Sequence, residues 1–398
     1  MRSNFLSVSH LTHLECTSCG QKYDPKQPHN LCACGSPLFA RYDPKKISSA
    51  ISRETLLKRD NTIWRYRELL PVDSGENIVT LGEGGTPLIL ASKIASRLGI
   101  KYILFKDESF SPTGSFKARG MSVAVSKAKE LGVTKICLPS AGNAGSAAAA
   151  YGVKAGIEVN VFMPQEVEEI YQQECQAYGA RLTLFGNSIL EAGQEMNRRI
   201  KKDWFDFSTL KEPYRVEGKK TMGYELAGQL NWILPDAIFY PTGGGTGLIG
   251  MWKAFEEMEQ LGWIDSFRPK MYVVQAEGCA PLVKAFLEGK QMSEPWQNPQ
   301  TLATGIRVPK ALADFIILKI VRESGGKAVA VSETEIQNAF RLAAKTEGIL
   351  LCPEGAAALA GLIKLLRYEK NDIPFRRPVI FNTGSVLKYR NYLRQTLP

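Results

Sequence analysis

The sequence predicts an α/β protein in which mainly parallel sheets are covered by helices. Short apolar runs alternate with longer amphipathic segments through most of the chain, and this alternation is typical of parallel strands joined by helical crossovers. The 398 residues suffice for two domains of ordinary size and an appendage. With 44% hydrophobic and 23% charged residues, the composition is that of a globular protein.

The first 44 residues are polar and predict a separate small segment. Four cysteines follow the pattern C-x2-C-x12-C-x1-C, which is close to zinc-ribbon spacing although the second pair is one residue short: Cys16, Cys19, Cys32 and Cys34. We expect a structural zinc ion there, because a segment this short cannot build a core of its own. Four thiolates leave no open position for catalysis. Vestigial cysteines and a redox role are the alternatives.

Charge and hydropathy suggest where the protein works and what it binds. No apolar run approaches the roughly 20 residues of a membrane span, and Met1-Arg-Ser-Asn-Phe-Leu-Ser-Val contains no secretory apolar region, so we expect a cytoplasmic protein without membrane contact. The net charge is +10, yet the basic residues are spread out, with only doublets such as Lys201-Lys202 and Lys219-Lys220. We therefore expect no nucleic-acid binding and an attraction for phosphorylated small molecules.

Helices and strands are predicted along the rest of the chain. Helices are expected over 45–58 and 64–70, followed by a glycine-rich loop at 81–88. The predicted strands are Tyr102–Phe105, Lys135–Leu138, Glu158–Met163, Arg181–Phe185, Ala237–Tyr240, Met271–Gln275 and Val379–Phe381. The predicted helices between and after them include Gly114–Leu131, Gly145–Ala155, Val167–Tyr178, Ile189–Lys201, Gly218–Leu230, Gly247–Leu261 and Ser332–Glu347. Domain boundaries are expected near residues 115 and 225.

One lysine is the first candidate for chemistry. The stretch Ser111-Pro-Thr-Gly-Ser-Phe-Lys117-Ala-Arg-Gly120 follows a predicted strand and precedes a helix. Open α/β sheets bind ligands at the carboxyl ends of their strands, and the small residues here leave room beside the amine. The alternative is a surface lysine that caps a turn. All three histidines lie within the first 30 residues, so catalytic proton transfer by the main body would fall to lysine, carboxylates, tyrosine or water.

Three further loops follow predicted strands. Gly243-Gly-Gly-Thr-Gly247 precedes a helix, so its amides and the helix N-terminus could hold a phosphate, although a glycine-rich turn is weak evidence alone. Ser140-Ala-Gly-Asn143-Ala-Gly-Ser-Ala147 could hold a carboxylate, or it could be a simple strand-to-helix turn. Asn382-Thr383-Gly-Ser385 would offer a hydroxyl. An amine, a phosphate cradle, a carboxylate site and a hydroxyl together are what pyridoxal phosphate and an amino acid require.

From about Trp64 to Leu387 the chain resembles the threonine synthase family of fold-type-II pyridoxal-phosphate enzymes. The resemblance implies a large domain of residues 45–115 plus 226–398, a small inserted α/β domain of residues 116–225, and a zinc-ribbon-like appendage at 1–44. It implies that Lys117 carries the cofactor as a Schiff base and acts as the mobile base. The other implied cofactor contacts are Asn143, Gly243, Gly244, Gly245, Thr246, Gly247 and Thr383. The implied substrate contacts are Thr86, Ser140, Ala141, Gly142, Ala144, Arg215 and Arg307.

The implied reaction converts O-phospho-L-homoserine and water into L-threonine and phosphate, and a homodimer is common in this family. The chain departs from the family pattern at Ala118, Ala141 and Ala144, and 208–215 keeps Arg215 but lacks an Asn-Ser pair. These departures leave two alternatives open. One is a threonine or serine dehydratase, or a phosphoserine β-replacement enzyme similar to cysteate synthase. The other is a non-catalytic paralogue with a regulatory role. Glu354 is expected at a helix N-terminus rather than in the site.

Overall fold

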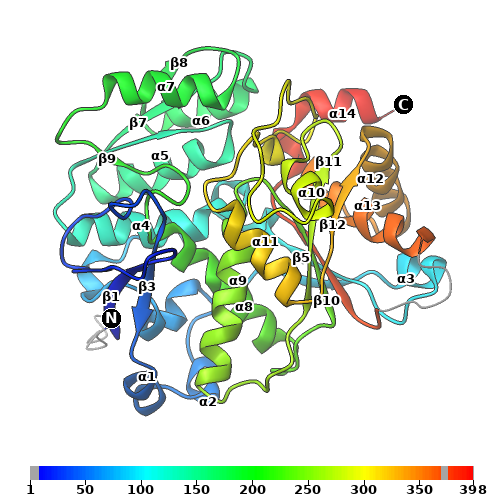
Figure 1. The fold of residues 1–398 in the computed structure, drawn as a ribbon, viewed down its shortest axis with the longest axis horizontal. Coiled ribbons are helices and arrows are strands. Elements are labelled where there is room, and N and C mark those ends of the chain that lie inside the picture. Colours follow the sequence, from blue (N-terminus) through cyan, green and yellow to red (C-terminus); the bar gives the residue numbers. More distant parts are fainter. Residues whose placement is uncertain (1–8, 369–374, 398) are drawn as a thin grey trace.

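The computed structural model describes residues 9–368 and 375–397, which form three sheets covered by helices (Figure 1). Residues 1–8, on which the expectation of no secretory signal partly rests, lie outside the described residues. Among the helices that the structure describes, none has the length and apolar character needed to cross a membrane.

The larger sheet has six strands. Their order is β12 (Ala328–Val331), β11 (Lys270–Ala276), β10 (Ala237–Pro241), β13 (Pro378–Asn382), β5 (Leu104–Asp107) and β4 (Leu88–Leu90). All neighbours pair in parallel except β4, which runs antiparallel to β5 at the edge. Successive side chains of β10 point to opposite faces, as the strand period requires: Ile238 packs with α9, and Phe239 packs with α13.

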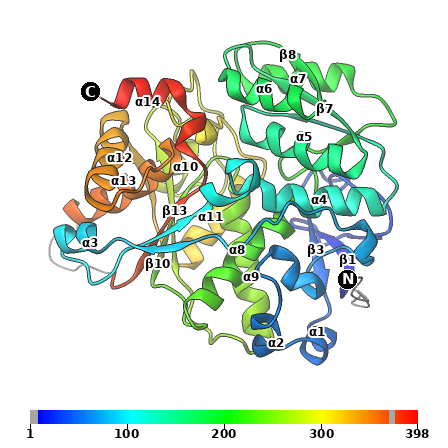
Figure 2. The same cartoon turned by 180° about the vertical axis from the view of Figure 1, so that it is seen from behind.

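The helices of this part of the molecule lie on both faces of the sheet (Figures 1 and 2). They are α3 (Ser92–Leu98), α9 (Thr246–Gln260), α10 (Pro281–Leu287), α11 (Asp314–Glu323), α12 (Glu333–Glu347), α13 (Pro353–Tyr368) and α14 (Arg390–Thr396). Covered on both sides, the inner strands are fully buried, which explains why the sequence shows them as continuous apolar runs.

The smaller sheet has four parallel strands in the order β8 (Arg181–Leu184), β7 (Glu158–Met163), β6 (Lys135–Pro139) and β9 (Phe205–Asp206). Its helices are α4 (Lys117–Glu130), α5 (Asn143–Ala155), α6 (Glu169–Ala177) and α7 (Ile189–Arg199). One face packs on α4 and α5 through Ile136 and Val161, and the other packs on α7 through Cys137 and Phe162. These strands lie within 116–225, and the limits of the small domain remain a prediction.

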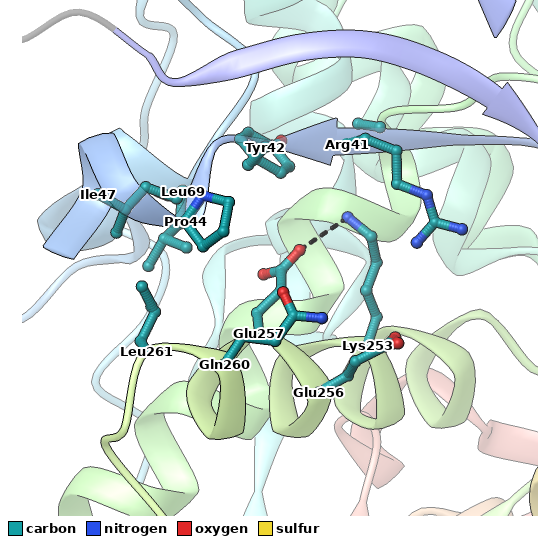
Figure 3. A pocket seen from close by; sticks show the side chains of 11 residues that line it. Arg41, Tyr42, Pro44, Ile47, Leu69, Lys253, Glu256, Glu257, Gln260 and Leu261 are labelled. Atoms are coloured by element: carbon teal, nitrogen blue, oxygen red, sulfur yellow. Dashed lines mark ion pairs between the residues drawn. The ribbon is translucent and has the colours of Figure 1, made fainter.

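The N-terminal residues 9–42, here called the cysteine module, form a third sheet. Its antiparallel order is β2 (Lys22–Tyr23), β1 (Leu11–Cys16) and β3 (Leu38–Tyr42). Leu14 and Ala40 of this sheet share a core with Met121 of α4, so the module packs on the main body. A cavity of about 100 Å³ remains at its junction with α9, lined partly by Tyr42 and Lys253 (Figure 3).

Helix α8 (Arg215–Gln229) lies between α4 and α9 and connects the two larger sheets (Figure 1). The backbones approach closely where glycines meet: a Cβ at Gly218 would lie 2.0 Å from the carbonyl oxygen of Arg119, and a Cβ at Gly120 would lie 2.7 Å from that of Arg215. This contact fixes the position of α8 against the helix that begins at Lys117.

Most predicted elements are confirmed, and several need correction. All seven predicted strands are present to within two residues, but β1, β2, β3, β4, β9 and β12 were not predicted. The expected helix over 45–58 is two helices, α1 (Pro44–Ala50) and α2 (Arg53–Leu57), because Ile51 and Ser52 are extended and Ser52 caps α2. The expected helix over 64–70 is a 3₁₀ segment, Ile63–Leu69.

Candidate active site

Lys117 is the first residue of α4, at the end of a tight turn that begins after β5. The turn needs left-handed backbone at Thr113 (φ 58°) and Gly114 (φ 62°). Two bonds attach it to the loop after β13: the Phe116 amide donates to the Thr383 carbonyl at 3.1 Å, and the Ser385 amide donates to the Gly114 carbonyl at 2.8 Å. The lysine turn and the hydroxyl-bearing loop, distant in sequence, therefore lie side by side.

The Lys117 amine is poised to lose its proton near neutral pH. Its Nζ lies 3.7 Å from the centroid of the Phe116 ring, and the side chain is half-buried. Burial lowers the pKa of Lys117 to about 7, with a further contribution from the positive charge of Arg215; Glu354 opposes the shift. A neutral amine is the form that attacks an aldehyde or accepts a proton.

The glycine loop between β10 and α9 has no space for side chains. A Cβ at Gly243 would lie 2.8 Å from Val308 Cγ2, and one at Gly247 would lie 1.9 Å from the Tyr240 hydroxyl oxygen. Gly245 takes a left-handed conformation, with φ +71°, and no side chain caps the N-terminus of α9. Open amides at a helix start attract phosphate.

Lys219 lies beside this loop, although it is not among the site residues predicted from the sequence. From α8, its Nζ donates to the hydroxyl of Thr246 at 2.7 Å. It is almost fully buried, and burial followed by the charges of Arg215 and Lys117 lowers its pKa well below the usual range. The only earlier signal was the Lys219-Lys220 doublet, which a helical pattern alone places on a surface. Three basic side chains, those of Lys117, Arg215 and Lys219, therefore lie within electrostatic reach of one another at the glycine loop.

The loop before α5 is held open by its own hydrogen bonds. The Ser140 hydroxyl accepts from the amides of Gly142 and Gly145, at 3.1 and 2.8 Å. A Cβ at Gly142 would lie 2.8 Å from the Tyr171 ring, and its φ of +141° excludes most other residues. Asn143 Nδ2 donates to the Tyr389 hydroxyl at 3.2 Å.

The Thr383 hydroxyl, at the end of β13, lies 3.8 Å from Cys352 Sγ. Asn382 next to it is fixed in the sheet, because it donates to Asp107 Oδ1 at 2.8 Å and accepts from the Cys352 amide at 2.9 Å. Glu354 is buried in the first turn of α13, as expected for a helix start, and it accepts from the Gly305 amide at 2.7 Å, but it also lies near enough to Lys117 to affect the pKa of that amine, which corrects the expectation that it lies outside the site. Burial raises the pKa of Glu354.

Several buried polar atoms around Lys117 have no hydrogen-bond partner within the described residues: Ser115 Oγ, Asn143 Oδ1, Arg215 Nε and Glu354 Oε2. Buried polar groups are rarely left unpaired, so this grouping indicates a polar ligand. With the lysine, the glycine cradle and the Thr383 hydroxyl, the residues fit pyridoxal phosphate.

The Arg215 guanidinium is fixed by the preceding loop. Its Nη1 donates to the Phe207 carbonyl at 2.5 Å, and its own amide donates to Glu212 Oε2 at 2.6 Å. Burial lowers the pKa of Arg215 to about 10 and raises the pKa of Glu212 to about 7. Thr209 of the same loop faces the glycine loop, because its Cγ2 would lie 3.0 Å from a Cβ at Gly244.

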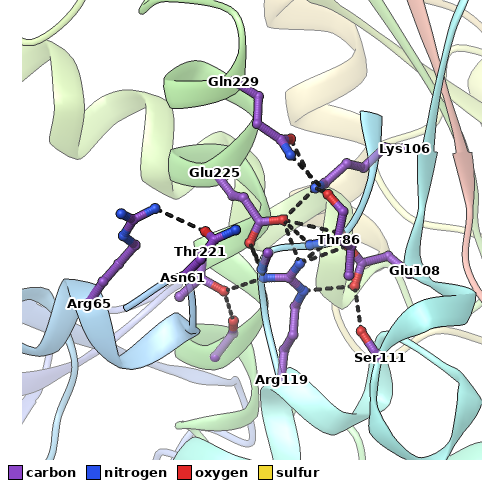
Figure 4. A network of polar contacts seen from close by, with 12 residues as sticks. Asn61, Arg65, Thr86, Lys106, Glu108, Ser111, Arg119, Thr221, Glu225 and Gln229 are labelled. Carbon is purple, nitrogen blue, oxygen red and sulfur yellow. Dashed lines mark hydrogen bonds and ion pairs between the residues drawn. The ribbon is translucent and has the colours of Figure 1, made fainter. Parts of the chain in front are cut away.

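Two predicted substrate residues lie in different surroundings. The Thr86 hydroxyl donates to Glu108 Oε1 at 2.6 Å inside a buried ionic network around Arg119 (Figure 4), so it is already engaged by protein groups. Arg307 is half-buried and follows a turn that packs against the glycine loop. The carbonyl oxygen of Gly305 in this turn would lie 3.1 Å from a Cβ at Gly243. The substrate roles of Thr86 and Arg307, and of Ser140, Ala141, Gly142 and Ala144, remain predictions.

The four cysteines converge in the cysteine module. All four sulfur atoms lie within 4.8 Å of one another, and the closest pairs, Cys16–Cys34 and Cys19–Cys32, are each 3.5 Å apart. Zn–S bonds of roughly 2.3 Å in a tetrahedron place sulfurs on the order of 3.8 Å apart, so the cluster fits a zinc ion. The Tyr23 hydroxyl also donates to Cys32 Sγ at 3.2 Å.

Comparison with known proteins agrees with this geometry. The profile of the family described as pyridoxal-phosphate-dependent enzymes matches residues 79–384. A threonine synthase of Methanocaldococcus jannaschii is 37% identical, over 94% of this chain and 92% of that protein. A threonine synthase of Methanosarcina acetivorans is 38% identical, over 89% of this chain and 87% of that protein.

The fold likewise matches a solved structure, that of the processed threonine deaminase isoform 2 from Solanum lycopersicum. The TM-score is 0.67, over 78% of this chain and 87% of that one, at 24% sequence identity. This likeness concerns the fold alone, whereas the sequence matches extend over almost the whole chain. The chain therefore belongs to the pyridoxal-phosphate-dependent enzymes and, among them, to the threonine synthase family.

Proposed function

We propose that this protein is a threonine synthase that converts O-phospho-L-homoserine and water into L-threonine and phosphate. The observation that carries the proposal is the Lys117 amine, with its pKa lowered to about 7, within electrostatic reach of Lys219, which contacts the glycine cradle at Thr246. The sequence matches to two threonine synthases support the same reaction.

Lys117 would hold the cofactor and move the protons. Pyridoxal phosphate, when bound, supplies an electron-accepting ring next to the substrate amino group. Lys117 Nζ would take the proton from the substrate Cα and then one from Cβ, because it is the basic group that its turn brings to this site. The Thr383 hydroxyl would face the pyridine nitrogen as a neutral partner. Asn143 would contact the phenolic oxygen of the cofactor through its side-chain amide.

Two phosphate groups would need two cationic sites. The open amides of the glycine loop and Lys219, which contacts Thr246, would hold the cofactor phosphate. Arg215 would bind the phosphate of the substrate, since its Nε is buried without a partner within the described residues. Arg215 would also stabilise the negative charge of the phosphate group as it leaves the substrate Cγ.

One assay separates the proposal from its closest alternatives. Purified holoenzyme is incubated with O-phospho-L-homoserine, with L-threonine and with O-phospho-L-serine, while phosphate, threonine and 2-oxobutanoate are measured. Equal amounts of phosphate and threonine from the first substrate support a synthase. 2-Oxobutanoate from threonine, without phosphate release from phosphohomoserine, would identify a dehydratase. Phosphate release from phosphoserine alone that depends on an added nucleophile would identify a β-replacement enzyme.

Visible absorbance tests the alternative that the protein is a non-catalytic paralogue. The wild-type protein should show a visible absorption band that Lys117→Ala abolishes and Lys93→Ala, at an exposed position, preserves. A colourless protein after reconstitution with pyridoxal phosphate would favour the paralogue.

We further propose that the four-cysteine cluster holds structural zinc, because its sulfur separations fit a tetrahedral site. None of the eight cysteines forms a disulfide within the described residues, which is typical of a reducing compartment and supports a cytoplasmic location. The substrate would be a small phosphorylated amino acid. The homodimer stays a prediction, which light scattering of the purified protein would test.

A further inference from the structure

The cysteine module contacts the loop that leads to Arg215. Asn30, two residues before Cys32, donates through Nδ2 to the carbonyl of Asp206 at 2.7 Å and to that of Lys211 at 3.4 Å. A weaker contact joins the Tyr214 hydroxyl to the Pro25 carbonyl at 3.5 Å. Residues 206–214, here called the 206–214 loop, are therefore held from outside by the N-terminal residues.

Asn30 supports from outside a loop that also bonds within itself, since the amides of Lys211 and Glu212 donate to the Ser208 carbonyl at 3.1 and 3.2 Å. Leu210 lies between the two carbonyls that Asn30 binds, and it adopts a left-handed backbone with φ 64°, which is unfavourable for a branched side chain. Ion pairing of Lys211 with Asp206 at 2.9 Å closes the loop from within, although the Lys211 side chain is 33% exposed while Asp206 is buried. Asn30 is half-buried and bridges the two ends at once.

The shape of the loop determines where the Arg215 guanidinium points. Phe207, next to the Asp206 anchor, supplies the carbonyl that accepts from Arg215 Nη1 at 2.5 Å. On its other side the loop lies against the glycine cradle, through Thr209 and Gly244. The Phe207 amide also donates to the Cys137 carbonyl at 2.7 Å, so Asn30 supports this end of the loop together with β6, and a shift here would move the carbonyl that orients Arg215.

We propose that Asn30 is a positioning residue for substrate phosphate, which makes the cysteine module part of the substrate-binding apparatus. The module acts through two carbonyl contacts on the 206–214 loop and, through Phe207, on Arg215. This inference rests on the proposed function for the identity of the substrate, but the contacts themselves do not depend on it.

The test compares Asn30→Ala and the near-isosteric Asn30→Asp with the wild type, each as holoenzyme. Gln27→Ala is the matched control, because Gln27 is exposed in the same module and its side chain makes no hydrogen bond to the 206–214 loop within the described residues. Three quantities are measured: kcat and KM for O-phospho-L-homoserine, the Kd of inorganic phosphate, and hydrogen exchange of peptides covering 206–214.

Both Asn30 variants should raise the KM and the phosphate Kd about tenfold, the effect of losing a bridging hydrogen-bond donor, with kcat within about twofold of the wild type. Amides of the 206–214 loop should exchange faster, while exchange in β1 and β3 stays unchanged. Gln27→Ala should match the wild type throughout.

Unchanged exchange in 206–214 together with an unchanged phosphate Kd in both variants would overturn the inference. A fall in kcat without a change in KM or Kd would also overturn it, since that pattern is expected of general damage rather than of phosphate positioning. If the wild type forms no threonine, the proposed function fails, while exchange and the phosphate Kd still decide whether Asn30 positions the loop.

Discussion

Arg119 and Glu225 form a bidentate ion pair in the interior between α4 and α8. Nη1 and Nη2 of the guanidinium each lie 3.0 Å from a carboxylate oxygen, and the two side chains are 0% and 4% exposed (Figure 4). Glu225 also accepts from the amides of Gly85 and Thr86, at 2.9 and 2.8 Å. The pair therefore joins the helix that begins with Lys117 to the glycine-rich loop at 81–88.

Removal of one partner of this pair should strongly lower the free energy of unfolding. Glu225→Ala leaves the charges of Arg119 and Lys106 with less compensation in a buried site, which typically costs about 3–5 kcal/mol. Urea unfolding of the variant measures the loss. As a control, Asp203→Ala removes the exposed pair with Lys135 and should cost less than about 1 kcal/mol. Similar losses in the two variants would contradict this account.

The pKa of Lys117 predicts a pH dependence of cofactor association. With the pKa at about 7, the rate at which the apoenzyme takes up pyridoxal phosphate should rise about tenfold per pH unit below 7 and level off above 8. Stopped-flow absorbance measures this rate. A rate that still climbs steeply between pH 8 and 10 would indicate an ordinary lysine, whose pKa is about 10.4.

The same shift affects stability in a defined direction. Between the folded pKa of about 7 and the unfolded value of 10.5, the unfolded chain binds more protons at Lys117 than the folded chain does. The contribution of this group to the free energy of unfolding of the apoprotein therefore rises with pH across that window. Urea unfolding of wild type and Lys117→Met at pH 7 and pH 9 isolates this contribution. The free energy of unfolding of the wild type, relative to that of the variant, should be higher at pH 9 than at pH 7, and an equal or lower value at pH 9 would contradict the prediction.

Loss of the Lys219 charge should weaken cofactor binding more than folding. Lys219→Gln removes a basic group beside Thr246 that a bound phosphate dianion would keep protonated, and a charge-assisted hydrogen bond to phosphate is worth about 1.5–3 kcal/mol, so the Kd of pyridoxal phosphate should rise roughly 10- to 150-fold. Absorbance titration of the apoprotein gives the Kd. Lys201→Gln, at an exposed position, is the control and should leave the Kd unchanged.

A methyl group in the glycine cradle should distort it. In Gly247→Ala the new Cβ would lie 1.9 Å from the buried Tyr240 hydroxyl oxygen, so stability should fall and pyridoxal phosphate should bind weakly. Gly228→Ala is the control, because Gly228 also lies in a helix but no heavy atom lies within 4 Å of the new Cβ. This substitution should stabilise α8 by up to about 1 kcal/mol. Thermal unfolding and cofactor titration distinguish the two.

The cysteine cluster should bind one metal ion per chain. Cys19→Ser should lower the zinc content measured by plasma emission spectrometry, while Cys175→Ser, at a buried cysteine outside the module, should not. Equal zinc content in the two variants would place the metal elsewhere.

The strands of the two larger sheets could be predicted because burial on both faces leaves continuous apolar runs, such as Ala237–Pro241. The first strand of the cysteine module, Leu11–Cys16, could not, since most of its side chains remain partly exposed and several are polar. The site loops were recognisable as strand ends. Lys219 was missed because its burial results from the packing of α8 against α4 and α9, which no local pattern reveals.

The Thr86 hydroxyl illustrates a second limit. The surrounding sequence resembles a substrate-binding stretch, but the partners that engage it, Glu108 and Glu225, come from distant parts of the chain. Their meeting point depends on how the helices are stacked, which is a property of tertiary structure alone.

Helix α8 carries Arg215 and Lys219 on its first turns and Glu225 further along. One residue inserted between Lys219 and Glu225 would rotate the second half by about 100° relative to the first, since a turn takes about 3.6 residues. Either the phosphate-facing cations or the buried anion would then be misdirected. Natural variants of this protein should accordingly tolerate length changes in surface loops such as 289–300 and preserve the residue spacing of this helix.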